Sequence, residues 1–79
     1  MKVRVLVTRR EGVLDSEGRV LATALRDLGY GGVEVSTGKL LLLDVEAPDA
    51  ESARKRTAEM CDKLLANPVI EKYAIEVLG

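Results

Sequence analysis

The sequence predicts an α+β domain of ferredoxin-like βαββαβ topology, in which an antiparallel sheet carries two helices on one face. Two observations predict it. Apolar residues alternate at period two in three segments and are continuous in a fourth, at residues 40–43, and two segments with helical spacing stand among them in the order strand, helix, strand, strand, helix, strand. No linker or low-complexity stretch divides the 79 residues, so residues 1–79 are expected to form a single domain.

The first strand is expected over residues 2–8, where the valines fall on one face of the chain. They are Val3, Val5 and Val7. A helix is expected over residues 16–28, because Asp15 is a favourable N-cap and Gly29 a favourable C-terminal cap. Gly18 should weaken the first turn of this helix by about 1 kcal/mol relative to alanine.

A second strand is expected at Val33 and Val35, followed by a hairpin whose tip is Thr37–Gly38. The next strand, residues 39–47, has the strongest apolar character and should end at Pro48.

The second helix should begin after Asp49 and end near Asn67, because the residue before Pro68 is disfavoured in helical geometry. Val69 and Ile70 should then enter the last strand. Alternating apolar residues continue it: Tyr73, Ile75 and Val77.

The face of the sheet without helices is predicted to be apolar at its centre. If Leu41 and Leu43 point toward the helices, then Leu40 and Leu42 point away from them, next to Leu6 on the first strand. Single exposed leucines are ordinary on protein surfaces. A cluster on a chain this small favours an interface instead, and we expect Leu6, Leu40 and Leu42 to mediate self-association.

The composition argues against several classes of function. Twelve Lys and Arg residues balance thirteen Asp and Glu residues, which gives a net charge of -1 and disfavours nucleic acid as a partner. No apolar run approaches the roughly 18 residues of a membrane span, and the first residues alternate in polarity instead of forming a signal-peptide core. We therefore expect a cytoplasmic protein with no membrane partner.

No catalytic, cofactor-binding or metal-binding residue is predicted. The chain has no histidine, which removes the commonest general base near neutral pH. Its one cysteine, Cys61, falls on the apolar side of the second helix and is expected to pack in the core. The remaining polar groups have structural interpretations as a hairpin, a loop, an exposed helix face and a helix cap. They are Ser36–Lys39, Arg9–Arg10, Arg54–Arg56, and Asp15 with Glu17.

The residues from Met60 to Glu76 carry a specific resemblance. The run Met-x-x-Lys-Leu-Leu-Ala-Asn-Pro-Val-Ile-Glu-x-Tyr-x-x-Glu resembles the PurS family, the small subunits of phosphoribosylformylglycinamidine synthase. The segment 13–18 and the step Gly38–Lys39 also match the family pattern. Three residues depart from it: Ser16 replaces a usual proline, Ser36 an arginine, and Lys72 a frequent acidic or polar residue.

The resemblance implies a non-catalytic subunit of a glutamine amidotransferase complex in purine biosynthesis. Such a subunit self-associates as a dimer or tetramer and bridges the large synthetase PurL and the glutaminase PurQ, so that ammonia passes between them. ATP, Mg²⁺ and glutamine would be used by those partners, with no cofactor in this chain. The polar residues Asn67, Glu71 and Lys72, within or next to the motif, are the predicted partner surface.

Two other functions share this topology. An ACT-like regulatory domain would bind a small ligand near the loop after the first strand, where Gly12 and Gly18 lie. An acylphosphatase-like enzyme would need a catalytic asparagine close to an arginine-bearing phosphate loop, whereas Asn67, the only asparagine, precedes Pro68 at the other end of the chain.

Overall fold

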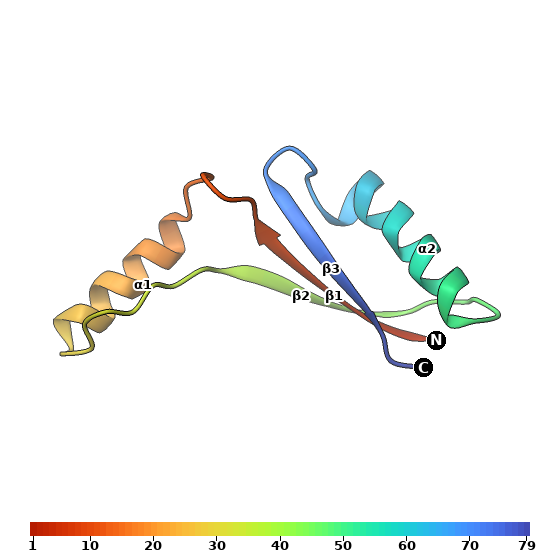
Figure 1. Cartoon of the computed structure of the whole chain (residues 1–79), viewed down its shortest axis with the longest axis horizontal. Helices are drawn as coiled ribbons and strands as arrows, with labels where there is room; N and C mark the ends of the chain where they lie inside the picture. The colour runs from red at the N-terminus through yellow and green to blue at the C-terminus, as the bar shows by residue number, and fades with distance from the viewer.

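The computed structural model describes residues 1–79 as a three-stranded antiparallel sheet with two α-helices (Figure 1). The sheet order is β2-β1-β3, with β1 in the centre. The elements in chain order are β1 (Lys2–Arg9), α1 (Ser16–Asp27), β2 (Gly38–Asp44), α2 (Ala50–Met60), the π-helical turn η1 (Cys61–Leu65) and β3 (Glu71–Val77). The fold class is confirmed: the arrangement is α+β and fits the ferredoxin-like type.

The core lies between β1 and α2. The three valines of β1, Val3, Val5 and Val7, are buried, as their alternation predicts. Against them pack buried residues of α2 and η1 at helical spacing: Ala53, Thr57 and Cys61. The hydroxyl of Thr57 donates to the Ala53 carbonyl at 2.7 Å, so this buried polar group is satisfied within the helix.

A π-helical turn follows α2 and leads into the connection to β3. Ala66 N–H donates to the Cys61 carbonyl at 3.0 Å, the five-residue spacing of a π-helix, and Ala66 itself is already extended. The helix therefore stops before Pro68, as predicted. The prediction that Val69 and Ile70 enter the sheet is wrong, because residues 68–70 form a turn and β3 begins at Glu71.

The first helix does not lie on the sheet. Figure 1 shows α1 projecting away from the strands, with residues 31–37 running beside it. We call residues 16–37 the arm. The expected strand at Val33 and Val35 and the hairpin at Thr37–Gly38 are not formed, because the chain continues straight from the arm into β2. Only α2 covers the sheet, so the part of the prediction that placed both helices on one face is not met within the single chain.

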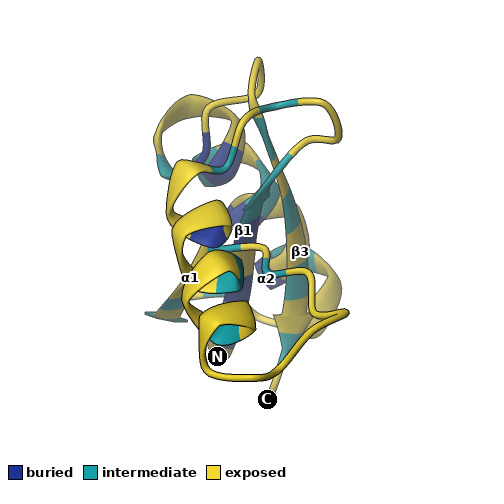
Figure 2. Ribbon diagram, turned by 90° about the vertical axis from the view of Figure 1, so that its left-hand side faces the viewer, coloured by how far each residue is buried: buried dark blue, intermediate teal, exposed yellow.

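The arm makes the molecule elongated. Its principal extents are 50 × 25 × 14 Å, and only nine of the 79 residues are buried. Figure 2 shows that the buried positions concentrate along β1 and the facing helix, while most of the surface of α1 is exposed. Neither helix has the length and apolar character needed to span a bilayer.

Candidate functional site

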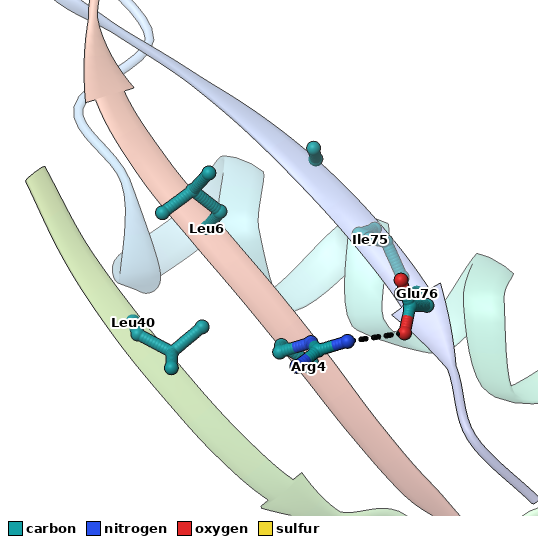
Figure 3. A pocket seen from close by; sticks show the side chains of 6 residues that line it. Arg4, Leu6, Leu40, Ile75 and Glu76 are labelled. Atoms are coloured by element: carbon teal, nitrogen blue, oxygen red, sulfur yellow. Dashed lines mark hydrogen bonds and ion pairs between the residues drawn. The ribbon is translucent and has the colours of Figure 1, made fainter.

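The open face of the sheet is the most apolar exposed surface of the strands. Leu6, Leu40 and Leu42 are 46%, 54% and 73% exposed, and all three point away from α2, as predicted. Leu6 lies opposite Leu40 on β2 and opposite Ala74 on β3. Figure 3 shows Leu6 and Leu40 side by side across the strands.

Ion pairs border this apolar centre. Arg4 pairs with Glu76 across β1 and β3, and Lys2 Nζ lies 2.8 Å from Asp44 Oδ2 across β1 and β2 (Figure 3 draws the first pair). A shallow hollow of about 410 Å³ lies next to the Arg4–Glu76 pair. The residues that line it are Arg4, Leu6, Leu40, Ala74, Ile75 and Glu76.

A second polar cluster joins the arm to the sheet. The Asp15 carboxylate accepts hydrogen bonds from the backbone N–H of Thr37 at 2.6 Å, from the Thr37 hydroxyl at 2.8 Å and from Gly18 N–H at 2.9 Å. Arg9 Nη1 lies 3.1 Å from Asp15 and donates to Thr37 Oγ1 at 2.8 Å. We call Arg9, Asp15 and Thr37 the latch.

The latch stabilises the ionised form of Asp15. The hydrogen bond from Thr37 N–H, followed by that from Gly18 N–H, lowers the pKa of Asp15 from 3.8 to about 2. The sequence predicts the cap role of Asp15, which is confirmed. It does not reveal the bonds to Arg9 and Thr37, because these residues are far from Asp15 in the chain or lie on another element.

The predicted partner residues are placed at one end of β3. Glu71 Oε1 accepts the N–H of Asn67 at 2.7 Å, and Asn67 Oδ1 accepts the N–H of Val69 at 3.1 Å, so both side chains order the turn. Lys72 alternates to the open face, opposite Thr8. The structure thus brings Asn67 and Glu71 together at the turn. The side chain of Lys72 points to the open face of the sheet, away from both.

The other candidate residues have structural roles. Burial raises the pKa of the Cys61 thiol, which is consistent with the predicted core position. The expectation that Arg9–Arg10 is a solvated loop is wrong, since Arg9 belongs to the latch and Arg10 Nε donates to the Pro68 carbonyl at 2.9 Å. Arg54 likewise donates from α2 to the Ile75 carbonyl at 2.9 Å.

Asp62 connects the π-helical turn to the last strand. The Tyr73 hydroxyl donates to Asp62 Oδ1 at 2.9 Å, and this bond is the main reason that the pKa of Tyr73 is raised. No group of three or more His, Cys, Asp or Glu side chains is arranged to hold a metal ion. The surfaces of the molecule, and not a cleft with reactive groups, are therefore its candidate sites.

Comparison with known proteins gives a consistent result. The family model "PurS: Phosphoribosylformylglycinamidine (FGAM) synthase" matches residues 2–79. The PurS subunit of phosphoribosylformylglycinamidine synthase from Archaeoglobus fulgidus is 51% identical over 72 residues, which are 90% of each chain. The corresponding subunit from Synechocystis is 47% identical over 94% of this chain and 75% of its own.

Solved structures agree with the sequence comparison. Methanocaldococcus jannaschii PurS superimposes with a TM-score of 0.85 at 42% identity, covering 95% of this chain and 92% of its own. A chain of the Thermotoga maritima PurLQS structure gives a TM-score of 0.85 at 33% identity, with coverages of 95% and 93%. The chain belongs to the PurS family.

Proposed function

We propose that this chain is the non-catalytic PurS subunit of phosphoribosylformylglycinamidine synthase, which bridges the large synthetase PurL and the glutaminase PurQ. The relatives at 51% and 47% identity are named as subunits of this enzyme, and the Thermotoga maritima relative lies in a PurLQS structure. The bridge allows ammonia released from glutamine to reach the synthetase without loss to solvent.

The observation that carries the proposal is the amount of apolar surface left exposed. Leucines, valines and other large apolar residues are exposed on the sheet face, on α1 and at the turn before β3. A monomeric protein rarely leaves such surfaces uncovered, and contiguous apolar patches mark interaction sites. A subunit whose role is assembly accounts for them.

We assign the open face to self-association. Its charged residues already form ion pairs within the chain, Arg4 with Glu76 and Lys2 with Asp44. The apolar centre of the face is therefore bordered by equal numbers of positive and negative charges. Such a surface is self-complementary, which a two-fold interface between identical chains requires. Leu6, Leu40 and Leu42 would form the buried centre of that interface.

The turn before β3 is the proposed contact with the other subunits. Asn67 and Glu71 stabilise the turn, which leaves Val69 exposed at its tip and Lys72 on the adjoining strand. ATP, Mg²⁺ and glutamine would be bound by PurL and PurQ. A cytoplasmic location fits the single cysteine, which is buried and unpaired as is usual in a reducing compartment.

A reconstitution experiment tests the proposal. Tagged chain is mixed with PurL and PurQ in the presence of glutamine and ADP, and the retained proteins are identified. We expect both partners to be retained, and glutamine-dependent formation of formylglycinamidine ribonucleotide to require all three chains. The proposal fails if neither partner is retained and the glutamine-dependent rate is the same without this chain.

A further inference from the structure

The arm is joined to the sheet by little besides the latch. No residue of the arm belongs to the apolar core or packs against it. Arg9 of β1 makes the only hydrogen bond from a strand to the arm, from Nη1 to Thr37 Oγ1 at 2.8 Å, and its Nη1 also lies 3.1 Å from Asp15 Oδ1. One arginine side chain therefore holds the arm in the direction seen in the structure.

The arm itself is held together as a unit. The Asp15 carboxylate accepts hydrogen bonds from Gly18 N–H at one end of the arm and from Thr37 N–H at the other. The carbonyl oxygen of Val35 lies directly against Gly18 in the first turn of α1. Val35 and Thr37 are half-buried while their even-numbered neighbours are exposed, so α1 covers the odd-numbered side of residues 31–37. The arm can therefore turn without losing its internal contacts.

Both connections of the arm leave the sheet at the same end. β1 ends at Arg9 and β2 begins at Gly38, which lies opposite Thr8 in the antiparallel register. The loop of residues 10–15 contains Gly12 at a φ of 81°, a conformation that glycine adopts without steric cost. The loop and Gly38 together form a hinge between the sheet and the arm.

The chain's own sheet has room for the arm. β2 pairs only with β1, so its other edge has no partner strand, and residues 31–37 are extended without pairing. An unpaired strand edge and an unpaired extended segment are complementary in their backbone hydrogen-bonding groups. With the arm extended, the radius of gyration is 15.8 Å, against about 12 Å for a compact domain of this length.

A hairpin loop of residues 36–38 would bring the two together in a favourable register. Three-residue hairpin loops place a glycine at their last position, which Gly38 supplies. This loop pairs Val33 with Leu41, and directly opposed residues point to the same face of a sheet. Leu41 is half-buried on the side of α2, so α1, on the odd-numbered side of residues 31–37, would reach the sheet on that same side.

We propose that the arm has a second position, folded in on the edge of its own β2, and that Arg9 holds it out. Breaking the bonds from Arg9 to Asp15 and Thr37 frees the arm at its hinge. Folded in, the arm adds a fourth strand and a second helix to the sheet of the same chain. The movement takes place within one chain, leaves the open face unchanged and does not depend on the proposed function.

Disulfide trapping tests the second position. A chain carrying Val33→Cys and Leu41→Cys, with Cys61→Ala to remove the native thiol, is oxidised with oxidised glutathione at low micromolar concentration. With the arm out, eight residues of extended chain separate the two cysteines by about 26 Å. With the arm folded in, their Cα atoms lie about 4.5–5.5 Å apart, within disulfide range. We expect both thiols to be lost while the chain stays at the monomer position on a non-reducing gel.

The role of Arg9 is tested in the same background. Arg9→Met removes two bonds made by a charged donor, and we expect the intrachain disulfide to form about tenfold faster. Arg9→Lys, which keeps the charge but not the forked geometry, should give an intermediate rate. Arg10→Met is the matched control, because Arg10 bonds to the Pro68 carbonyl and not to the latch, and it should leave the rate unchanged.

A further pair of cysteines checks the register. Glu34→Cys with Leu41→Cys should cross-link far more slowly, because residue 34 points to the opposite face from Leu41 in the folded-in position. Circular dichroism of each variant establishes that it is folded.

Three results would overturn the proposal. A folded Arg9→Met protein that keeps both thiols free would show that the arm does not reach the edge of its own β2. A covalent dimer as the main product of Val33→Cys/Leu41→Cys would place the contact between copies and not within one chain. Equal rates for Arg9 and Arg9→Met would show that Arg9 does not hold the arm out.

Discussion

At the scale of single residues, Asp15 links three parts of the chain. It caps α1 through Gly18, holds the start of β2 through Thr37 and pairs with Arg9 at the end of β1. The same carboxylate therefore sets both the beginning of the helix and the direction in which the arm leaves the sheet. A neutral cap could do only the first of these.

The depressed pKa of Asp15 predicts an acid-dependent part of the stability. Because the folded pKa is about 2 and the ordinary value is 3.8, the contribution of Asp15 is present above about pH 4 and is lost as the pH falls toward 2. Asp15→Asn, which can still cap a helix, should unfold at lower denaturant concentration at pH 7. The difference between the two proteins should shrink between pH 4 and pH 2.

Asp27→Asn is the matched control, since Asp27 lies exposed at the other end of α1 and forms no ion pair. Denaturant unfolding curves at several pH values measure both variants against the unchanged chain. A constant difference between Asp15→Asn and the unchanged chain from pH 7 to pH 2 would refute the role assigned to the charge.

Gly18 is needed for close packing, although glycine is a poor helix former. A Cβ atom there would collide with the carbonyl oxygen of Val35, which lies directly against the first turn of α1. Alanine would otherwise favour the helix by about 1 kcal/mol. We expect the collision, at about 1–3 kcal/mol, to outweigh this gain, so that Gly18→Ala lowers the free energy of unfolding.

Gly31→Ala serves as the control in the same arm, because a Cβ atom at Gly31 meets no atom within 4 Å. Chemical denaturation should leave Gly31→Ala unchanged or slightly more stable. If Gly18→Ala is as stable as Gly31→Ala or more so, the close packing of α1 on residues 31–37 does not persist in solution.

At the scale of elements, features that depend on residues close in sequence are predicted correctly, whereas the pairing of distant segments is not. The caps Asp15 and Asp49, the inward valines of β1 and the stop before Pro68 depend on neighbours in sequence, and all are found. The alternation at Val33 and Val35 indicates an extended segment correctly. It does not say which strand lies beside it, and no strand of this chain does.

The candidate site shows the same division. The outward direction of Leu6, Leu40 and Leu42 follows from period two alone, and it is confirmed. The latch could not be predicted, because its bond between Arg9 and Thr37 depends on the chain running straight through residues 31–38, where the sequence predicts a hairpin. The sequence predicts that Glu71 is available to a partner, yet its side chain accepts the backbone N–H of Asn67.

This bond makes Glu71 a measurable part of the turn before β3. Glu71→Ala leaves the N–H of Asn67 without its acceptor at 2.7 Å, and should lower the free energy of unfolding by about 1 kcal/mol. Lys72→Ala, exposed and without an ion pair, should change it by less than about 0.5 kcal/mol. Thermal and urea unfolding of both variants provide the measurement.

The same two variants also distinguish a residue that stabilises the turn from one that contacts a partner subunit. If Lys72→Ala keeps its stability but binds PurL or PurQ more weakly, Lys72 belongs to the partner surface. Equal stability of Glu71→Ala and the unchanged chain would mean that the turn does not depend on the Glu71 side chain.

At the scale of the whole molecule, two separate surfaces are left uncovered in the single chain. The arm and the edge of β2 lie at one side of the sheet, and the open face lies opposite α2. A contact through the open face alone would join two chains about a two-fold axis, as proposed above.

The open-face interface can be removed without touching the arm. Leu42 lies opposite Arg4 on that face and is 73% exposed in the single chain, so Leu42→Lys should not disturb folding. In the assembly it would place an unpaired ammonium in a desolvated centre, at a cost of about 3 kcal/mol, which weakens that contact roughly a hundredfold. Light scattering at micromolar concentration should then show a lower mass than that of the unchanged protein. Val69→Lys, at an exposed turn position away from the open face, should retain the full mass. A Leu42→Lys protein that is folded by circular dichroism and still has the mass of the unchanged assembly would mean that Leu42 lies outside any contact between copies.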